Sequence, residues 1–225
     1  MPKICVSIIP KNNDQALSLI KLAEEAKADF IEVRLDCLEH TNFSKLVQAS
    51  KIPLVATTKL TSESGFFSGT EAERKETILT AAENGFEYAD LDLSSPSLQE
   101  TTEKLKQLGT KPIISYHKFD GTLSRSAMER VMQQQIASGA SVCKIVTSAR
   151  KMEDNLVVLN FVASQSNKAK LVCFCMGETG KISRLLSPVF GGFFTFASLE
   201  QSDETASGQM TIDEMQMIYD RIGAK

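Results

Sequence analysis

Apolar runs alternate with amphipathic runs along the whole chain. Eight short runs are apolar or β-branched without sustained polar alternation, a pattern typical of strands that are covered on both faces. They span residues 3–9, 30–36, 53–58, 88–93, 111–117, 142–147, 170–175 and 192–197. The segments between them show helical spacing, as in Ala16, Leu19, Ile20 and Ala23. The pattern therefore predicts an α/β protein in which each strand is followed by a helix.

Two of the predicted helices carry clear start signals. Thr70 followed by Glu73 has the spacing of a capping box, in which each side chain bonds the other residue's backbone N–H. Pro96 after Ser95 predicts another start, because proline fits the first helical position. These signals support alternating strands and helices.

Such alternation fits either a (β/α)8 barrel or an open doubly wound sheet. The first strand runs into "SIIPKNND", which lacks the Gly-rich dinucleotide fingerprint of many doubly wound sheets. No linker, low-complexity tract or internal repeat divides the sequence. We therefore expect residues 1–225 to form a single (β/α)8 barrel domain.

Composition and charge narrow the class of protein. The 225 residues are 42% hydrophobic and 24% charged, as in soluble globular domains. No run of about eighteen apolar residues predicts a membrane span. The net charge of -3 gives no reason to expect nucleic acid or an anionic membrane as partner. Met1 is followed almost at once by a strand, so we expect no signal peptide.

Cysteine and histidine usage argues against a metal centre. The five cysteines lack the spacing of a zinc or redox motif, which predicts small core residues in a reducing cytoplasm. His40 and His117 are the two histidines, too few for a multi-histidine site. His40, in the turn "LEHTNF", is expected at the surface.

Charged residues gather where the predicted strands end, and the active site of such a barrel lies at those ends. Structural explanations remain open for some: a salt bridge for Glu32 with Arg34, loop capping for Asp90 and Asp92, and core packing for His117. The whole set is Glu32, Arg34, Lys59, Glu63, Asp90, Asp92, His117, Lys144 and Arg184. So many charges at one rim predict an active site.

Lys144 breaks the apolar pattern of "SVCKIVTSA". Burying an ammonium group is costly unless it is paired or neutral. Burial and neighbouring cations both lower a lysine pKa, so we expect a neutral amine. A neutral amine attacks carbonyl carbon and forms a Schiff base. Lys144 is therefore the candidate nucleophile.

The other charged residues suit the steps that follow. A protonated imine acidifies the adjacent C–H bond, and His117 could remove that proton near neutral pH. Glu63 could orient the imidazole, while Arg34, Lys59 and Arg184 could bind an anionic group. The residues alone thus predict a Schiff-base lyase or aldolase with an anionic keto substrate.

Six segments, in order along the chain, resemble motifs of one family. They are "EVRLD", "ISYHKF", "CKIVTSA", "MGETGKISR", "FGGFFTFA" and "TASGQMT". The chain resembles the type I 3-dehydroquinate dehydratases of the shikimate pathway over nearly its whole length. That resemblance implies a barrel fold, no metal or cofactor, and a homodimer.

The resemblance also assigns roles. Lys144 would form an imine with the ketone of 3-dehydroquinate. His117 would take the adjacent proton and then protonate the departing hydroxyl, giving 3-dehydroshikimate and water. Glu63 would position His117. The residues implied in substrate binding are Ser7, Glu32, Arg34, Lys59, Arg184, Thr205 and Gln209.

Three positions depart from the family pattern. Lys59 stands where an arginine is usual, which keeps the charge and loses the bidentate fork. Ser64 replaces the first glycine of the family's E-G-G motif, and Thr205 replaces a common serine. Each departure leaves the candidate nucleophile and base in place.

Two alternative functions stay open. One is another Schiff-base aldolase or lyase barrel, in which "FGG" at 190–192 could hold a phosphate. The other is a barrel that binds a metabolite without turnover, which predicts no covalent adduct.

Overall fold

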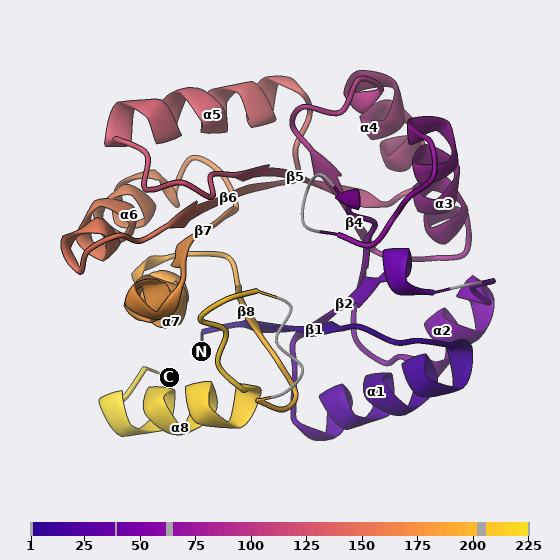
Figure 1. Ribbon diagram of the computed structural model, residues 1–225, viewed down its shortest axis with the longest axis horizontal. Helices are drawn as coiled ribbons and strands as arrows, with labels where there is room; N and C mark the ends of the chain where they lie inside the picture. Colours follow the sequence, from indigo (N-terminus) through magenta and orange to yellow (C-terminus); the bar gives the residue numbers. More distant parts are fainter. Residues whose placement is uncertain (1, 39, 62–64, 202–205, 225) are drawn as a thin grey trace.

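The protein is a (β/α)8 barrel. The computed structural model describes residues 2–38, 40–61, 65–201 and 206–224. Eight parallel strands form one sheet in the order β7-β6-β5-β4-β3-β2-β1-β8, and helices surround the ring of strands (Figure 1). The strands are β1 Ile4–Ile8, β2 Phe30–Arg34, β3 Leu54–Thr57, β4 Tyr88–Asp92, β5 Lys111–His117, β6 Val142–Ser148, β7 Leu171–Met176 and β8 Thr195–Ala197.

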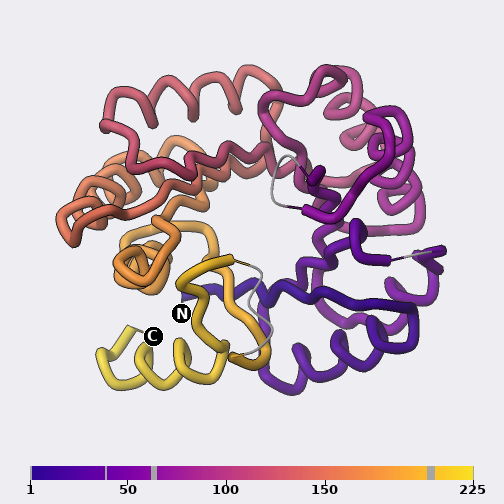
Figure 2. Tube along the Cα trace, viewed as in Figure 1, coloured from indigo at the N-terminus to yellow at the C-terminus, as the bar shows by residue number. Residues whose placement is uncertain are grey.

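The two ends of the sheet meet between β7 and β8. The backbone N–H of Phe193, just before β8, donates to the carbonyl of Leu171 at the start of β7, with N···O of 2.8 Å. On the other side β8 pairs with β1, so the first and last strands are neighbours. Figure 2 shows the chain passing around the ring in sequence order. This circular order confirms the barrel and excludes the open doubly wound sheet.

The helices occupy the intervals predicted from the sequence. They are α1 Asn13–Glu25, α2 Phe43–Ala49, α3 Glu71–Glu83, α4 Leu98–Gln107, α5 Arg125–Ala137, α6 Glu153–Gln165, α7 Lys181–Leu186 and α8 Ile212–Ile222. Short 3-10 turns are η1 Leu35–Cys37, η3 Glu178–Gly180 and η4 Ser187–Phe190. The capping box of Thr70 and Glu73 is present at the start of α3.

The predicted helix start at Pro96 is wrong. α4 begins at Leu98, with Ser97 as its N-cap residue. Ser95 instead belongs to a turn, because its N–H donates to the carbonyl of Asp92 and its hydroxyl to a carboxylate oxygen of Glu71 on α3. This tie to the neighbouring helix moves the start of α4 two residues along the chain.

The barrel interior has an apolar half and a polar half. Side chains in a strand alternate between faces, so residues two apart share the inner face. Near the strand starts these are Cys5, Phe30, Val55, Tyr88, Ile113 and Val142, all within one buried cluster. Two residues further along, the same faces carry Ser7, Glu32, Thr57, Asp90, Ser115 and Lys144, which are also buried. The inner strand pattern thus places the polar residues above an apolar floor.

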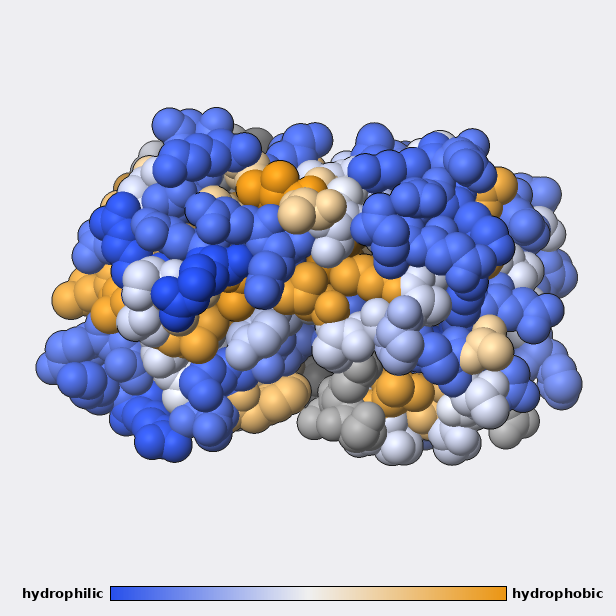
Figure 3. Space-filling view, turned by 90° about the horizontal axis from the view of Figure 1, so that it is seen from above, coloured by the Kyte–Doolittle hydropathy of each residue, from blue (hydrophilic) through white to orange (hydrophobic). Residues whose placement is uncertain are grey.

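The surface fits the expectations from composition. The face in Figure 3 is mostly hydrophilic, with apolar side chains gathered near its middle. Within the described ranges, no helix is both long and apolar enough to cross a membrane. All five cysteines are free thiols, and those other than Cys37 are buried, as expected for core residues. His40 is exposed, as predicted.

The "FGG" segment lies at the wrong end of the barrel for a catalytic phosphate site. Gly192 immediately precedes Phe193, whose N–H bonds the first residue of β7, and Thr195 N–H bonds the Lys3 carbonyl just before β1. These are the N-terminal ends of the strands, whereas barrel active sites lie at the C-terminal ends. The phosphate cradle considered for an aldolase is therefore wrong.

Candidate active site

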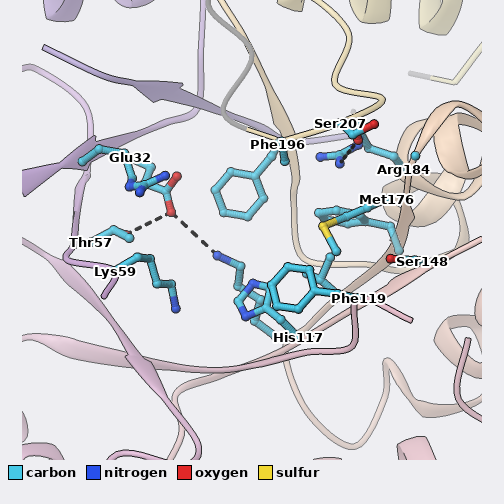
Figure 4. A pocket seen from close by; sticks show the side chains of 16 residues that line it. Glu32, Thr57, Lys59, His117, Phe119, Ser148, Met176, Arg184, Phe196 and Ser207 are labelled. Carbon is cyan, nitrogen blue, oxygen red and sulfur yellow. Dashed lines mark hydrogen bonds and ion pairs between the residues drawn. The ribbon is translucent and has the colours of Figure 1, made fainter. Parts of the chain in front are cut away.

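The polar half of the barrel opens into a cavity of about 520 Å³ at the C-terminal ends of the strands. Figure 4 shows Glu32, Lys59 and His117 turned toward the same space, with Arg184 and Ser207 at its other end. The predicted residues that line this cavity are Glu32, Arg34, Lys59, His117, Lys144 and Arg184. The structure thus brings together residues that are up to 152 positions apart in the sequence, the separation of Glu32 and Arg184.

The remaining predicted site residues lie beside the cavity or outside the described ranges. Ser7 is buried and its hydroxyl donates to the Glu32 carboxylate. Gln209 is buried in the segment after Ser207, whose carbonyl accepts a hydrogen bond from the N–H of Gly177. The predicted residues Glu63 and Thr205, and Ser64 beside the first of them, lie outside the described residues.

Lys144 is held by an ion pair deep in the barrel. Its Nζ lies 2.8 Å from Asp90 Oδ2, 3.7 Å from Glu32 Oε1 and 4.4 Å from the centre of the Phe196 ring. Burial by itself lowers the pKa of Lys144, but the carboxylates of Asp90 and Glu32 outweigh it and the pKa is raised. The expectation of a neutral amine is therefore wrong, because two carboxylates approach the ammonium group closely.

Asp90, whose role the sequence pattern left undecided, lies at the centre of this buried network. Its Oδ1 accepts hydrogen bonds from Lys59 Nζ and Ser115 Oγ, both at 2.7 Å, and Oδ2 accepts from Lys144. Burial raises the pKa of Asp90, but the charges of Lys144 and Lys59 outweigh it and hold that pKa well below its usual range. Asp90 is thus an ionised carboxylate shared by two lysines.

The loop-capping explanation holds for Asp92 alone. Its Oδ1 accepts from both the N–H and the hydroxyl of Ser94, at 2.9 and 2.6 Å. Asp90 and Asp92 were grouped because they are two apart in the sequence. Their positions along the strand could have distinguished their roles. Asp90 follows Tyr88 on the inner face, at the level of Lys144, whereas Asp92 is the last residue of the strand.

His117 ends β5 and lines the cavity. Burial of the ring, followed by the charges of Lys59 and Lys144, holds the pKa of His117 well below its usual range. The ring stacks on Phe119, with centroids 6.1 Å apart and planes 14° from parallel. A neutral imidazole has a free lone pair on one nitrogen, so the group can accept a proton from a bound molecule.

Arg34 and Glu32 do not form the salt bridge considered from the sequence. Arg34 makes a bidentate pair with Asp36, with Nε–Oδ1 of 2.9 Å and Nη2–Oδ2 of 2.6 Å. Glu32 accepts instead from Ser7 and from Thr57 Oγ1, the latter at 3.0 Å. Both charged groups are therefore fixed by other partners and face the cavity with defined orientations.

Arg184 supplies a buried cation at the other end of the cavity. Arg184 is 1% exposed, and its guanidinium carbon lies 4.4 Å from the centre of the Phe174 ring. Its Nη2 donates to the carbonyl of Ser207 at 3.4 Å. A guanidinium group in an apolar wall is suited to a carboxylate, which it can bind through two parallel hydrogen bonds.

Replacing Asp90 by alanine should destabilise the fold. The change leaves Lys59 and Lys144, each less than 10% exposed, without their shared carboxylate. Removing one partner of a buried ion pair typically costs about 3–5 kcal/mol. We expect urea unfolding to show a loss in that range. Asp92→Ala is the control, with an expected loss below about 1.5 kcal/mol because it removes only turn hydrogen bonds. Equal losses for the two variants would contradict the buried network.

Comparison with known proteins identifies the family. The family model of type I 3-dehydroquinase matches residues 4–225. The chain belongs to the type I 3-dehydroquinase family.

Members of the type I 3-dehydroquinase family are similar to this chain over nearly its whole length. The chain is 34% identical over 219 residues to the 3-dehydroquinate dehydratase of Dehalococcoides mccartyi, covering 97% of this chain and 95% of the relative. It is 33% identical over 214 residues to that of Methanothermobacter thermautotrophicus, covering 94% and 93%. The crystal structure of 3-dehydroquinate dehydratase from Geobacillus kaustophilus superposes with a TM-score of 0.90 at 23% identity, covering 100% and 92%. The last match supports the fold.

Proposed function

We propose that this type I 3-dehydroquinase dehydrates 3-dehydroquinate to 3-dehydroshikimate through a Schiff base on Lys144, as a step of aromatic amino acid biosynthesis. The observation that carries the proposal is one cavity lined by Lys144, His117 and the buried guanidinium group of Arg184. Each group suits a different part of the substrate: the ketone, the proton beside it, and the carboxylate.

The first half of the reaction joins substrate to enzyme. Lys144 loses one proton, and its nitrogen adds to the ketone carbon. The former carbonyl oxygen takes one proton from this nitrogen and one from solvent, which replaces the proton that Lys144 lost, and leaves as water, so that a protonated imine remains. The imine draws electrons from the adjacent carbon, so His117 can remove a proton there and an enamine forms.

The second half eliminates water. The enamine electrons move toward the ring carbon that bears the leaving hydroxyl, and His117 returns its proton to that oxygen. Water departs and a carbon–carbon double bond conjugated to the imine forms. Hydrolysis of the imine then releases 3-dehydroshikimate and restores Lys144. In the proposal Glu63 positions His117, although it lies outside the described residues.

Binding groups surround the reacting centre in the proposal. Arg184 binds the carboxylate, and Glu32 and Arg34 bind ring hydroxyls. Ser7 supports Glu32 from below through its hydrogen bond. Gln209 and Thr205 also bind substrate in the proposal, and Thr205 lies outside the described residues. Each assignment follows the family motif and, for the described residues, a position in or beside the cavity.

Borohydride trapping tests the proposal directly. The protein is incubated with 3-dehydroquinate and sodium borohydride, and intact mass and peptide mapping are then recorded. We expect a reduced substrate adduct on Lys144, together with formation of 3-dehydroshikimate in the absence of borohydride. A well-folded sample that yields neither would contradict the function, and a binding barrel without turnover would give that result.

Replacing Arg184 by alanine should raise KM by about 10- to 100-fold, because a hydrogen-bonded charge pair contributes roughly 1.5–3 kcal/mol. If the pair is equally strong in the ground and transition states, kcat stays nearly unchanged. Steady-state kinetics with 3-dehydroquinate measure both constants. Arg221→Ala, which removes an exposed arginine on α8, is the control and should leave KM unaltered. An unchanged KM in the Arg184 variant would remove that residue from the carboxylate site.

The proposal also places the enzyme in the cytoplasm as a homodimer. Four buried thiols suit a reducing compartment. The homodimer is carried over from the resemblance to the family. Light scattering on the purified protein measures the mass, and the 24.7 kDa of one chain would contradict the dimer.

A further inference from the structure

Lys59 occupies a position where the family usually has an arginine, and its side chain is directed at other protein groups. Its Nζ donates to Asp90 Oδ1 at 2.7 Å and to Ser115 Oγ at 2.9 Å. An ammonium group has three protons, so two of them are already used. An arginine has five N–H donors in a planar fork and could contact both the network and a ligand. The lysine is therefore better placed to act on the network than on the substrate.

We propose that Lys59 is a positioning residue that shares Asp90 with Lys144 and thereby makes Lys144 release its proton more readily to become the nucleophile. This inference rests on the proposed Schiff-base function and adds a residue that controls it. Asp90 is the link, because its two oxygens hold the two ammonium groups separately.

The charges around Lys144 determine the direction of the effect. Among the described residues, Asp90 on β4 and Glu32 on β2 are the carboxylates paired with its ammonium group. The other charged or titratable groups that line the cavity or act on this cluster are Cys5 on β1, Arg34 on β2, Lys59 after β3, His117 on β5 and Arg184 on α7. Within this set, Lys59 is the cation that bonds the same carboxylate as Lys144. It therefore weakens the hold of Asp90 on the Lys144 proton.

The positive charge of Lys59 also acts on His117, the base in the proposed reaction. The positive charge of Lys59 is, after burial, the largest influence that lowers the pKa of His117 and keeps the ring neutral. Lys59 thus favours the reactive forms of both groups: it promotes loss of the proton from Lys144 to solvent and keeps a proton off His117. A neutral residue at position 59 would favour the charged, unreactive form of each group.

Competitive acetylation measures this effect without substrate. Trace acetic anhydride acetylates only the neutral amine, and peptide mass mapping gives the extent of reaction at Lys144 from about pH 8 to 13, a range wide enough for a lysine whose pKa is raised above its ordinary value. In Lys59→Met we expect the midpoint for Lys144 to move to higher pH by about one pH unit or more, as a neighbouring charge typically causes. Lys59→Arg restores the charge and should return the midpoint close to that of the wild type.

Enzyme kinetics provide the second measurement. We expect the rising limb of kcat/KM against pH to move upward in Lys59→Met and to be restored in Lys59→Arg. Lys59→Gln keeps a hydrogen-bond donor for Asp90 without the charge, so it serves if the methionine variant does not fold. It should show the same upward movement.

Other outcomes overturn the inference. An unchanged acetylation midpoint with KM raised at every pH would make Lys59 a substrate-binding residue. An unchanged midpoint with only a lower melting temperature would make it a packing residue. Because acetylation needs no 3-dehydroquinate, these outcomes are distinct from failure of the proposed function, in which the wild type would form no borohydride adduct.

Discussion

Alanine at position 117 is expected to lower kcat by about 100-fold or more, the usual contribution of a positioned acid–base group. His117 is the neutral imidazole in the cavity, and the proposed reaction uses it twice, once to take a proton from carbon and once to return it to the leaving oxygen. The Lys144 amine is untouched by the change. We therefore expect borohydride still to trap substrate on Lys144 while turnover is nearly lost.

His40→Ala provides a matched control, because His40 is the other histidine, is exposed and is not among the residues that line the cavity. That variant should have wild-type kcat and KM. Rapid-mixing measurements of product formation, together with the trapping yield, separate imine formation from proton abstraction. Normal turnover in His117→Ala would show that another group is the base. Loss of trapping along with turnover would indicate that His117 is needed for imine formation as well.

The barrel and the candidate catalytic pair, His117 and Lys144, could be predicted because their signals are local. Strand and helix periods are visible within a dozen residues, and Lys144 stands out against four apolar neighbours. His117 ends a run that matches a family motif. Such signals need no knowledge of which strands are adjacent. The structure confirms the barrel and places His117 and Lys144 in one cavity, and their catalytic roles stay predictions.

The role of Asp90 could not be predicted because its partners come from distant parts of the chain. Lys59 is 31 residues away and Lys144 is 54 residues away, and their hydrogen bonds depend on the arrangement of β3, β4 and β6. For the same reason the pKa of Lys144 was predicted to shift in the wrong direction. Counting nearby cations suggested a neutral amine, whereas distances show that carboxylates are closest.

The structure also changes the explanation of how the buried Lys144 could become reactive. Apolar neighbours alone do not make Lys144 a neutral amine, because Asp90 and Glu32 raise its pKa. The ion pair keeps the amine in its charged form and fixes its position. In the proposed reaction Lys144 must therefore lose one proton, and the groups that bond Asp90 and Glu32 affect how readily it does so.

Replacing Lys144 by methionine should abolish both the adduct and turnover. Methionine has a similar length but no nitrogen, so no imine can form. We expect kcat to fall by about 10⁴-fold or more, as it does when a covalent nucleophile is removed from an enzyme. Intact mass after borohydride treatment should equal that of the unmodified protein. Lys151→Met, at an exposed position, is the control for the substitution itself and should behave as the wild type.

Lys144→Arg separates the chemistry from the ion pair. Arginine keeps a cation beside Asp90 but stays protonated and cannot form the imine. We therefore expect it to lose turnover as completely as the methionine variant while unfolding in urea closer to the wild type. Methionine leaves Asp90 paired with Lys59 alone and removes the cation that lies 3.7 Å from Glu32. Appreciable turnover in either variant would mean that the reaction does not proceed through Lys144, since neither side chain can form the covalent intermediate.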